Sequence, residues 1–495
     1  MDNRFYFGFN TSEERKKRRK AELYSMSEQV STFFWDEAPQ HGLEMREGQQ
    51  DMSFEIVDAL INDQHFAIEA GVGIGKSFGY LVPVLLYSKR MNKPVIIATS
   101  TIALQEQLWR DVHAVMPLLG LNRDVILAKG QTHYLCNKRA DEYMCDPKAD
   151  PPDALKEGIQ QGYEERKDFP EVLPQGVWDK VNVQRFSMKN CSSCEKKCKY
   201  YKVRAALKFT DGVVLCNQDF LTQHLMKLRR GQEGLINAAA DLLVVDEAHN
   251  LDDKVRSATT ERFGQGMLFG MIKSAFYELR SFDQSSVSGE KREAESAIIA
   301  FYNCLKAQVQ KQINEAEQDM RYADRFFFDN NGSAIELLTE MNAAIHNLSS
   351  SIQIYSSMDF RNNRSFAASD DLDAVSESLS ELLDQIDDML IWIEQHGSNT
   401  ELVYCPKNTK EIVSRLYFNG DERTILTSAT LTNATSGSLE EQYSYFISNT
   451  GFPAGDRGCL SEPKPSPYPY DEHAMIYYCD DLPHPTREHE AFIEK

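Results

Sequence analysis

Short apolar runs that end in glycine, acidic or hydroxyl residues recur along the chain and predict buried strands. Residues 66–68 lead into a glycine-rich turn, and apolar positions at helical spacing follow at residues 80–85. Residues 242–245 are continuously apolar, which is typical of a parallel strand buried on both faces. A third apolar run ends in TSATL at residues 427–431. Strands separated by helical patterns in this way predict an α/β fold.

A different pattern covers about residues 260–396, where apolar residues recur every three or four positions. Polar stretches at 283–290 and 359–369 interrupt it and are expected to be loops. The pattern predicts an all-helical domain inserted between the second and third strands. We expect its last helix to run through DLDAVSESLSELLDQIDDMLIWIEQH, residues 371–396.

Composition narrows the class of protein. The chain has 495 residues, 42% of them hydrophobic, which is enough for packed cores. The net charge of −21 would repel nucleic acid, so any DNA contact must use local basic patches. We find no signal peptide and no apolar run of about 18 residues, so we expect no membrane span and a cytoplasmic location. Clustered cysteines in that compartment bind metal more often than they form disulfides.

The glycine-rich turn has the spacing of a phosphate-binding loop. A strand, a loop and a helix N-terminus are arranged so that backbone N–H groups and the helix dipole face a phosphate. Lys76 is expected to reach the β- and γ-phosphates of ATP, and Ser77 to bind Mg²⁺. Ala70 stands where the general pattern has glycine. The predicted nucleotide-binding loop is Ala70, Gly71, Val72, Gly73, Ile74, Gly75, Lys76 and Ser77.

The second buried strand ends in the sequence DEAH. Carboxylates at the carboxyl end of a parallel strand lie where α/β sheets bind ligands. Asp246 is expected to bind Mg²⁺, directly or through water, and Glu247 to activate the attacking water. Ser428 and Thr430 of TSATL could pair with His249 and connect the nucleotide to the rest of the protein.

A phosphate loop, DEAH and SAT in this order resemble the motifs of superfamily 2 helicases, and further segments resemble the DinG and XPD-like branch. EMREGQQDM is similar to its Q motif, which implies that Arg46 and Gln49 contact adenine. Residues 95–108 resemble its motif Ia, which implies that Thr99, Thr101 and Gln105 lie near DNA phosphates. The family usually has Asn-His where this chain has Asn217-Gln218.

Cysteines between motif Ia and DEAH suggest a metal site. CSSCEKKC supplies three thiols, at positions 191, 194 and 198, and a fourth lies upstream in GQTHYLC. Four thiolates suit a [4Fe–4S] cluster and also tetrahedral Zn²⁺, and spacing alone does not separate the two. The resemblance implies a [4Fe–4S] cluster held by Cys136, Cys191, Cys194 and Cys198. Cys145 is expected to be a spare thiol.

The sequence around this cluster offers a basic patch. Lysine and arginine dominate residues 189–208, with Tyr200 and Tyr201 among them, and this favours a contact with DNA over a merely solvated helix. Together with these patterns, the resemblance implies a RecA-like motor domain with two insertions. The expected ranges are a leader at 1–38, motor domain 1 at 39–115, 206–258 and 400–450, a cluster domain at 116–205, a helical arch domain at 259–399 and the start of a truncated motor domain 2 at 451–495.

The resemblance implies an ATP-dependent 5′-to-3′ DNA helicase that acts on single-stranded and forked DNA in repair or replication, expected to be a monomer. We find no Gln-x-x-Gly-Arg-x-x-Arg motif after TSATL, so the sequence is expected to be incomplete. Two alternatives stay open. One is a truncated, non-catalytic protein that binds ATP and DNA, and the other is a zinc-containing ATPase that acts on protein partners.

Overall fold

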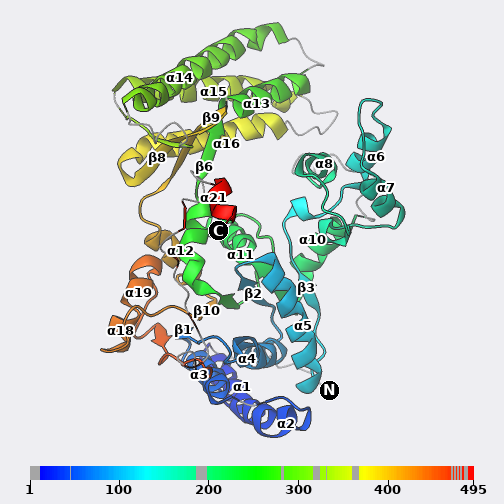
Figure 1. The fold of residues 1–495 in the computed structure, drawn as a ribbon, viewed down its shortest axis with the longest axis vertical. Helices are drawn as coiled ribbons and strands as arrows, with labels where there is room; N and C mark the ends of the chain where they lie inside the picture. The colour runs from blue at the N-terminus through cyan, green and yellow to red at the C-terminus, as the bar shows by residue number, and fades with distance from the viewer. Residues whose placement is uncertain are drawn as a thin grey trace, which may run out of the picture.

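The structure is a computed structural model that describes residues 12–44, 46–184, 198–279, 284–315, 324–330, 332–358, 367–397, 399–469 and short pieces within 472–494. Figure 1 shows three parts: a central sheet with its helices, a segment with α6–α8 and α10 at one side, and a helical layer at the far end. Among the described residues, no helix is long and apolar enough to cross a membrane.

A seven-stranded parallel sheet forms the central part, with the order β11-β1-β10-β5-β2-β4-β3. Most of its positions are apolar and buried, which is why the strands read as continuous apolar runs. The SAT strand β10 lies between the phosphate-loop strand β1 and the DEAH strand β5. The strands are β1 (His65–Glu69), β2 (Val95–Thr99), β3 (Val125–Leu127), β4 (Val213–Asn217), β5 (Leu242–Asp246), β10 (Arg423–Ser428) and β11 (Gly458–Leu460).

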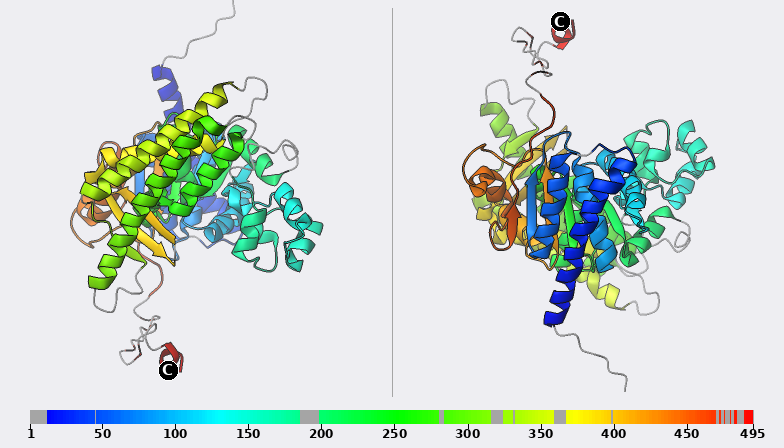
Figure 2. Two further views of the ribbon diagram at one scale, coloured as in Figure 1. Left: turned by 90° about the horizontal axis from the view of Figure 1, so that it is seen from above. Right: turned by 90° about the horizontal axis from the view of Figure 1, so that it is seen from below.

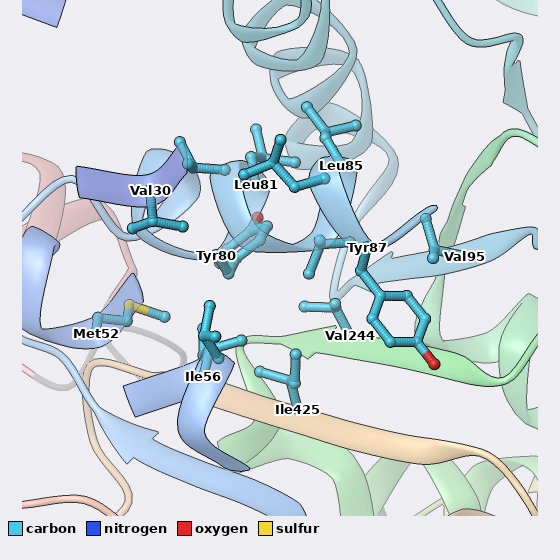
Figure 3. Packing of buried hydrophobic residues seen from close by; sticks show 14 of the residues in the cluster. Val30, Met52, Ile56, Tyr80, Leu81, Leu85, Tyr87, Val95, Val244 and Ile425 are labelled. Atoms are coloured by element: carbon cyan, nitrogen blue, oxygen red, sulfur yellow. The ribbon is translucent and has the colours of Figure 1, made fainter. Parts of the chain in front are cut away.

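Helices cover both faces of this sheet. On one face Tyr80, Leu81 and Leu85 belong to one buried cluster with Val244 and Ile425 of the strands, and Figure 3 labels these residues. The view from below has α1 and its neighbours in front of the sheet (Figure 2). The helices of this face are α1 (Ser12–Thr32), α3 (Glu47–Ile61), α4 (Lys76–Met91) and α5 (Ile102–Leu118), with the short α2 (Ala38–Gln40). The other core contains residues of α10 (Lys199–Phe209), α11 (Gln218–Arg229), α12 (Leu251–Ala258), α17 (Lys410–Tyr417), α18 (Leu439–Gln442) and α19 (Ser444–Thr450).

The predicted α/β fold with a parallel sheet is confirmed, but the prediction that the arch is all-helical was wrong. Four helices pack together, and beside them lies a four-stranded antiparallel sheet of order β6-β9-β8-β7. The expected last helix stops at Asp384, and MLIWIEQH is a strand, because its β-branched and aromatic residues favour pleated pairing. The elements are β6 (Glu261–Gly264), α13 (Gln265–Glu278), α14 (Ser288–Glu315), β7 (Arg325–Phe327), α15 (Gly332–Met358), α16 (Ala367–Asp384), β8 (Met389–His396) and β9 (Asn399–Pro406).

Some expected domain limits also differ from the structure. Part of the predicted leader belongs to the central core, where Val30, Phe33 and Phe34 are buried. The strand β9 lies in the arch sheet rather than at the start of a motor segment. The strand β11 pairs with β1 in the central sheet, although residues 451–495 were expected to begin a second motor domain.

Candidate nucleotide-binding site

The predicted phosphate loop leaves the end of β1 and enters the first turn of α4. Gly73 and Gly75 have φ angles of +90° and +87°, a region that glycine enters without a steric penalty. Gly75 is the N-cap of α4, so the first N–H groups of that helix point out of its end and have no partner within the helix. Ala70 is buried and forms a bridge with Lys464, so a small residue suits this position.

Lys76 and Glu247 join the loop to the DEAH turn. The Lys76 ammonium donates to Glu247 Oε1 at 3.0 Å, and both side chains are partly buried. The two residues are 171 positions apart, and they meet because β1 and β5 lie on either side of β10. The two groups that the sequence assigns to the phosphate and to the attacking water therefore lie at one point.

A chain of hydrogen bonds continues from Glu247 to the SAT strand. Ser428 Oγ donates to Glu247 Oε2 at 3.3 Å, and His249 Nδ1 lies 2.7 Å from Ser428 Oγ. His249 Nδ1 is also 3.3 Å from Glu247 Oε2. The predicted pairing of His249 with TSATL thus involves Ser428, while the Thr430 N–H donates to Ser428 Oγ at 3.4 Å.

The DEAH turn has a strained backbone that a buried glutamine holds. Glu247 has a φ of +56°, which is uncommon for a residue with a side chain. Gln218 Nε2 donates to the carbonyl oxygens of Asp246 and Glu247, at 2.7 and 3.1 Å. The sequence marks Gln218 only as a departure from the pattern of the resembling family. The structure gives it a definite contact at the first residue of α11.

Asp246 has the surroundings of a cation ligand. Burial raises its pKa to about 6, against the opposing charge of Lys76. The Tyr80 hydroxyl donates to Asp246 Oδ2 at 3.4 Å and also hydrogen-bonds Ser77. A hydroxyl and a buried carboxylate thus flank one tyrosine, and these are oxygen donors of the kind Mg²⁺ prefers. Asp111, whose carboxylate hydrogen-bonds Ser77, was missed because nothing in the α5 sequence marks it.

A cavity of about 160 Å³ lies beside the phosphate loop. Gln49 Nε2 donates to the carbonyl oxygen of Gly75 at 2.9 Å, so the Q-like segment contacts the loop directly. Aromatic and apolar side chains supply much of the remaining lining, which suits a flat base. Phe33 and Phe34 come from the predicted leader, where only their apolar character could have identified them. The cavity is lined by Phe33, Phe34, Ala38, Leu43, Glu44, Arg46, Gln49, Gly75 and Phe78.

The motif Ia residues are placed differently from each other. Gln105 was expected near DNA phosphates, but it is fully buried and donates to the carbonyl oxygens of Ala128 and Leu215. That prediction was wrong, because the amide binds the backbone between strands. Thr99 is also buried. Thr101 is exposed and caps α5 by accepting the Leu104 N–H.

Two of the four expected cluster cysteines can be placed. Cys191 and Cys194 lie outside the described residues. Cys136 is buried in a small apolar cluster with Tyr134 and Val183, and Tyr200 of α10 packs on it. Cys198 is the N-cap of that helix. Cys136 thus belongs to an apolar cluster on which α10 packs through Tyr200, and Cys198 stands at the start of that helix.

No group of three or more metal-ligating side chains is found within the described ranges. The elements of this segment are α6 (Asn137–Cys145), α7 (Asp153–Gln160), α8 (Gln175–Val181) and α10. Cys145 is exposed at the end of α6.

Several basic side chains of the helix α10 form ion pairs or hydrogen bonds within the protein. Lys199 pairs with Glu165 at 2.8 Å, Lys208 pairs with Glu233 at 2.6 Å, and Arg204 donates to the Leu235 carbonyl. Tyr200 packs on Tyr134, with ring centroids 5.3 Å apart, whereas Tyr201 is half exposed. Of the two tyrosines, Tyr201 is the one whose ring is available for stacking on a base.

Residues 131–266 match the DEAD_2 family. The chain is 24% identical to the probable ATP-dependent helicase YpvA of Bacillus subtilis, over 90% of this chain and 69% of that protein. It is 26% identical to the 3′-5′ exonuclease DinG of Bacillus subtilis, over 88% of this chain and 50% of that protein. It is 30% identical to the ATP-dependent DNA helicase YoaA of Escherichia coli, over 46% of this chain and 36% of that protein.

The chain thus spans between about a third and about two thirds of the length of these relatives. A solved structure, that of S. tokodaii Xpd4, aligns with 84% of this chain and 61% of that one, at 14% identity and a TM-score of 0.39.

Proposed function

We propose, from the premise that this chain is a DinG-like member of the XPD-like helicases, that it binds and hydrolyses ATP to move along single-stranded DNA. The observation that carries the proposal is the contact between Lys76 and Glu247 across β10, because it brings a phosphate-binding cation and a general base to one point. The relatives named as helicases favour a catalytic protein over the non-catalytic alternative.

Each residue of the site would have a separate role in ATP hydrolysis. The loop backbone and the N-terminus of α4 hold the phosphates. Lys76 exchanges Glu247 for the γ-phosphate, and this exchange frees the carboxylate to orient and deprotonate the attacking water. A Mg²⁺ ion, when bound, would neutralise the negative charge that develops on the phosphate. Asp246 and Ser77 are the residues that would hold it.

Ser428 and His249 would transmit a change in the position of the Glu247 carboxylate to the strand β10. Their hydrogen bonds to each other and to Glu247 change when the carboxylate turns from Lys76 to a water molecule. Because Ser428 ends β10, the change reaches the segment that follows TSATL. This is a contact route by which hydrolysis can be coupled to movement along DNA.

Finer parts of the proposal rest on the family resemblance. They are the 5′-to-3′ direction, forked DNA as a substrate, a role in repair, a monomeric state, a cytoplasmic location and a [4Fe–4S] cluster at Cys136, Cys191, Cys194 and Cys198. The last of these is supported by Cys136 in an apolar cluster and by Cys198 at the start of α10, the helix whose Tyr200 packs on that cluster.

ATP hydrolysis by the whole chain, purified without oxygen, tests the proposal. The rate is measured with and without single-stranded DNA, for the parent, for Lys76→Ala and for Lys89→Ala, an exposed lysine on the same helix. We expect DNA to stimulate the parent and Lys89→Ala, while Lys76→Ala is inactive. Equal rates for the parent and Lys76→Ala would exclude the assigned site. Duplexes with a 5′ or a 3′ tail then test the direction.

A further inference from the structure

The residues after β11 lie along the start of the phosphate loop. The Lys464 N–H donates to the Glu69 carbonyl and the Gly71 N–H donates to the Lys464 carbonyl, each at 2.9 Å. Ser466 Oγ donates to the Val72 carbonyl at 2.7 Å. We call residues 461–468 the brace, because they extend strand-like pairing from β1 into the loop.

Two loop glycines are required by this contact. A Cβ atom on Gly71 would lie 2.7 Å from the Ser466 nitrogen, which is too close for any side chain. A Cβ atom on Gly73 would overlap the ring of Tyr468. Gly75 is crowded instead by Gln49. The loop is therefore shaped by protein from its outer side, and the glycines at 71 and 73 let the brace approach.

The brace also contacts the helix that carries the Q-like segment. Lys464 Nζ lies 2.7 Å from Glu55 Oε1 and 3.7 Å from Asp51 Oδ2, both on α3. Gln49, near the start of the same helix, bonds the loop at Gly75. One segment thus touches both parts of the chain that line the expected nucleotide site, and it does so through side chains and backbone.

We propose that Ser466 and Tyr468 are positioning residues of the ATP site, which hold the first half of the loop in its phosphate-binding form. Binding of phosphate fixes the loop and therefore the brace, and an ordered brace in turn favours binding, because such coupling is reciprocal. The residues that follow Tyr468 would then respond directly to whether nucleotide is bound at the loop. This inference rests on the proposed function, since it takes ATP as the ligand of the loop.

Affinity for a fluorescent ADP analogue, measured on the whole chain, tests the role of the ring. We expect Tyr468→Ala to raise the Kd about five- to tenfold, as the loss of roughly 1 kcal/mol of pre-organisation would. Tyr468→Phe keeps the ring and should bind like the parent. Tyr445→Ala removes an exposed tyrosine of α19 and is the matched control. In hydrolysis assays the KM of Tyr468→Ala should rise more than its kcat falls.

Hydrogen exchange of residues 461–469 with and without the analogue supplies a second readout. Slower exchange in the presence of nucleotide is expected for the parent and not for Lys76→Ala. If Tyr468→Ala loses its fold, Ser466→Ala replaces it, with an expected rise in Kd of about threefold. Parent-like affinity of these variants together with nucleotide-independent exchange would overturn the brace. A parent chain that binds no nucleotide would instead overturn the proposed function, and this inference with it.

Discussion

The ammonium of Lys76 lies 3.0 Å from Oε1 of Glu247, so the phosphate loop and the DEAH turn are held together by an ion pair. Side-chain exposures of 16% and 24% place the pair in partly desolvated surroundings, where its attraction exceeds that of an exposed pair. A γ-phosphate that enters the loop must compete with Glu247 for the same cation. The carboxylate would then be released at the moment a water molecule needs a base.

Glu247→Gln separates binding from chemistry. We expect it to lower the rate of ATP hydrolysis by about 10²- to 10⁴-fold, because an amide cannot take a proton from water. The affinity for ATP should be equal to that of the parent or higher, because Lys76 no longer has an anionic partner in the protein. Equilibrium binding and single-turnover hydrolysis measure the two quantities. Glu336→Gln, at an exposed position of α15, is the control. Rapid turnover by Glu247→Gln would remove this residue from the mechanism.

Gln218→Ala tests the support of the DEAH turn. The change leaves two carbonyl oxygens without their donor, and we expect a loss of about 2 kcal/mol in the free energy of unfolding. Hydrolysis should fall roughly tenfold, because the left-handed backbone of Glu247 is no longer fixed.

Two further variants separate this support from general damage. Gln223→Ala, at an exposed position of the same helix, should match the parent in urea unfolding and in hydrolysis. Gln218→His, the residue usual in the resembling family, keeps a ring N–H donor and should retain most of the activity. Unchanged hydrolysis and stability in Gln218→Ala would show that the turn holds its shape without this amide.

Buried neutral His65 makes stability depend on pH. Burial, with the charges of Arg423 and Arg457, lowers its pKa to about 4. His65 Nδ1 accepts the Thr424 N–H at 3.0 Å, so protonation of that nitrogen would break the bond. In the unfolded chain this histidine binds a proton near pH 6.5. The contribution of neutral His65 to the free energy of unfolding is therefore complete above pH 6.5 and is lost as the pH falls towards 4.

The measurement is urea unfolding at pH 5 and at pH 7 for the parent and for His65→Gln. From pH 7 to pH 5, the free energy of unfolding of the parent should fall by about 2 kcal/mol more than that of the variant. His346→Gln, at an exposed position of α15, should show the pH dependence of the parent. Identical pH profiles for the parent and His65→Gln would mean that His65 is not held neutral.

Much of the central sheet could be predicted because its strands are continuous apolar runs that end in charged or hydroxyl residues. The side-by-side placement of β1, β10 and β5 could not, because strand order depends on packing between segments hundreds of residues apart. For the same reason the sequence could not reveal that Ser466 and Tyr468 lie against Gly71 and Gly73. The sequence of β8 predicts a helix as readily as a strand, because a short apolar run after a helical pattern fits both periods.

The residues of the candidate site show the same division between what motifs predict and what only the structure reveals. Lys76, Glu247 and His249 stand in motifs whose spacing carries the chemistry, so they could be predicted individually. Gln218, Asp111 and Phe33 have no such pattern, and only three-dimensional contacts identify them. Gln105 shows the converse, since a polar residue in a segment expected to contact DNA bonds the backbone of its own protein.

Removal of single thiols tests the metal centre. We expect Cys136→Ser and Cys198→Ser each to lower the iron content of protein purified without oxygen, because a [4Fe–4S] cluster needs four thiolates. Cys145→Ser should keep the iron of the parent, since this thiol is exposed at the end of α6. Iron and zinc are both measured on the purified chains, together with thermal unfolding. Because Cys136 sits in the apolar cluster with Tyr134 and Val183, its loss should also lower the unfolding temperature of this segment. Zinc in place of iron in the parent would reject the iron–sulfur proposal and leave a Cys₄ zinc site, whereas full iron in Cys198→Ser would remove that residue from the ligand set.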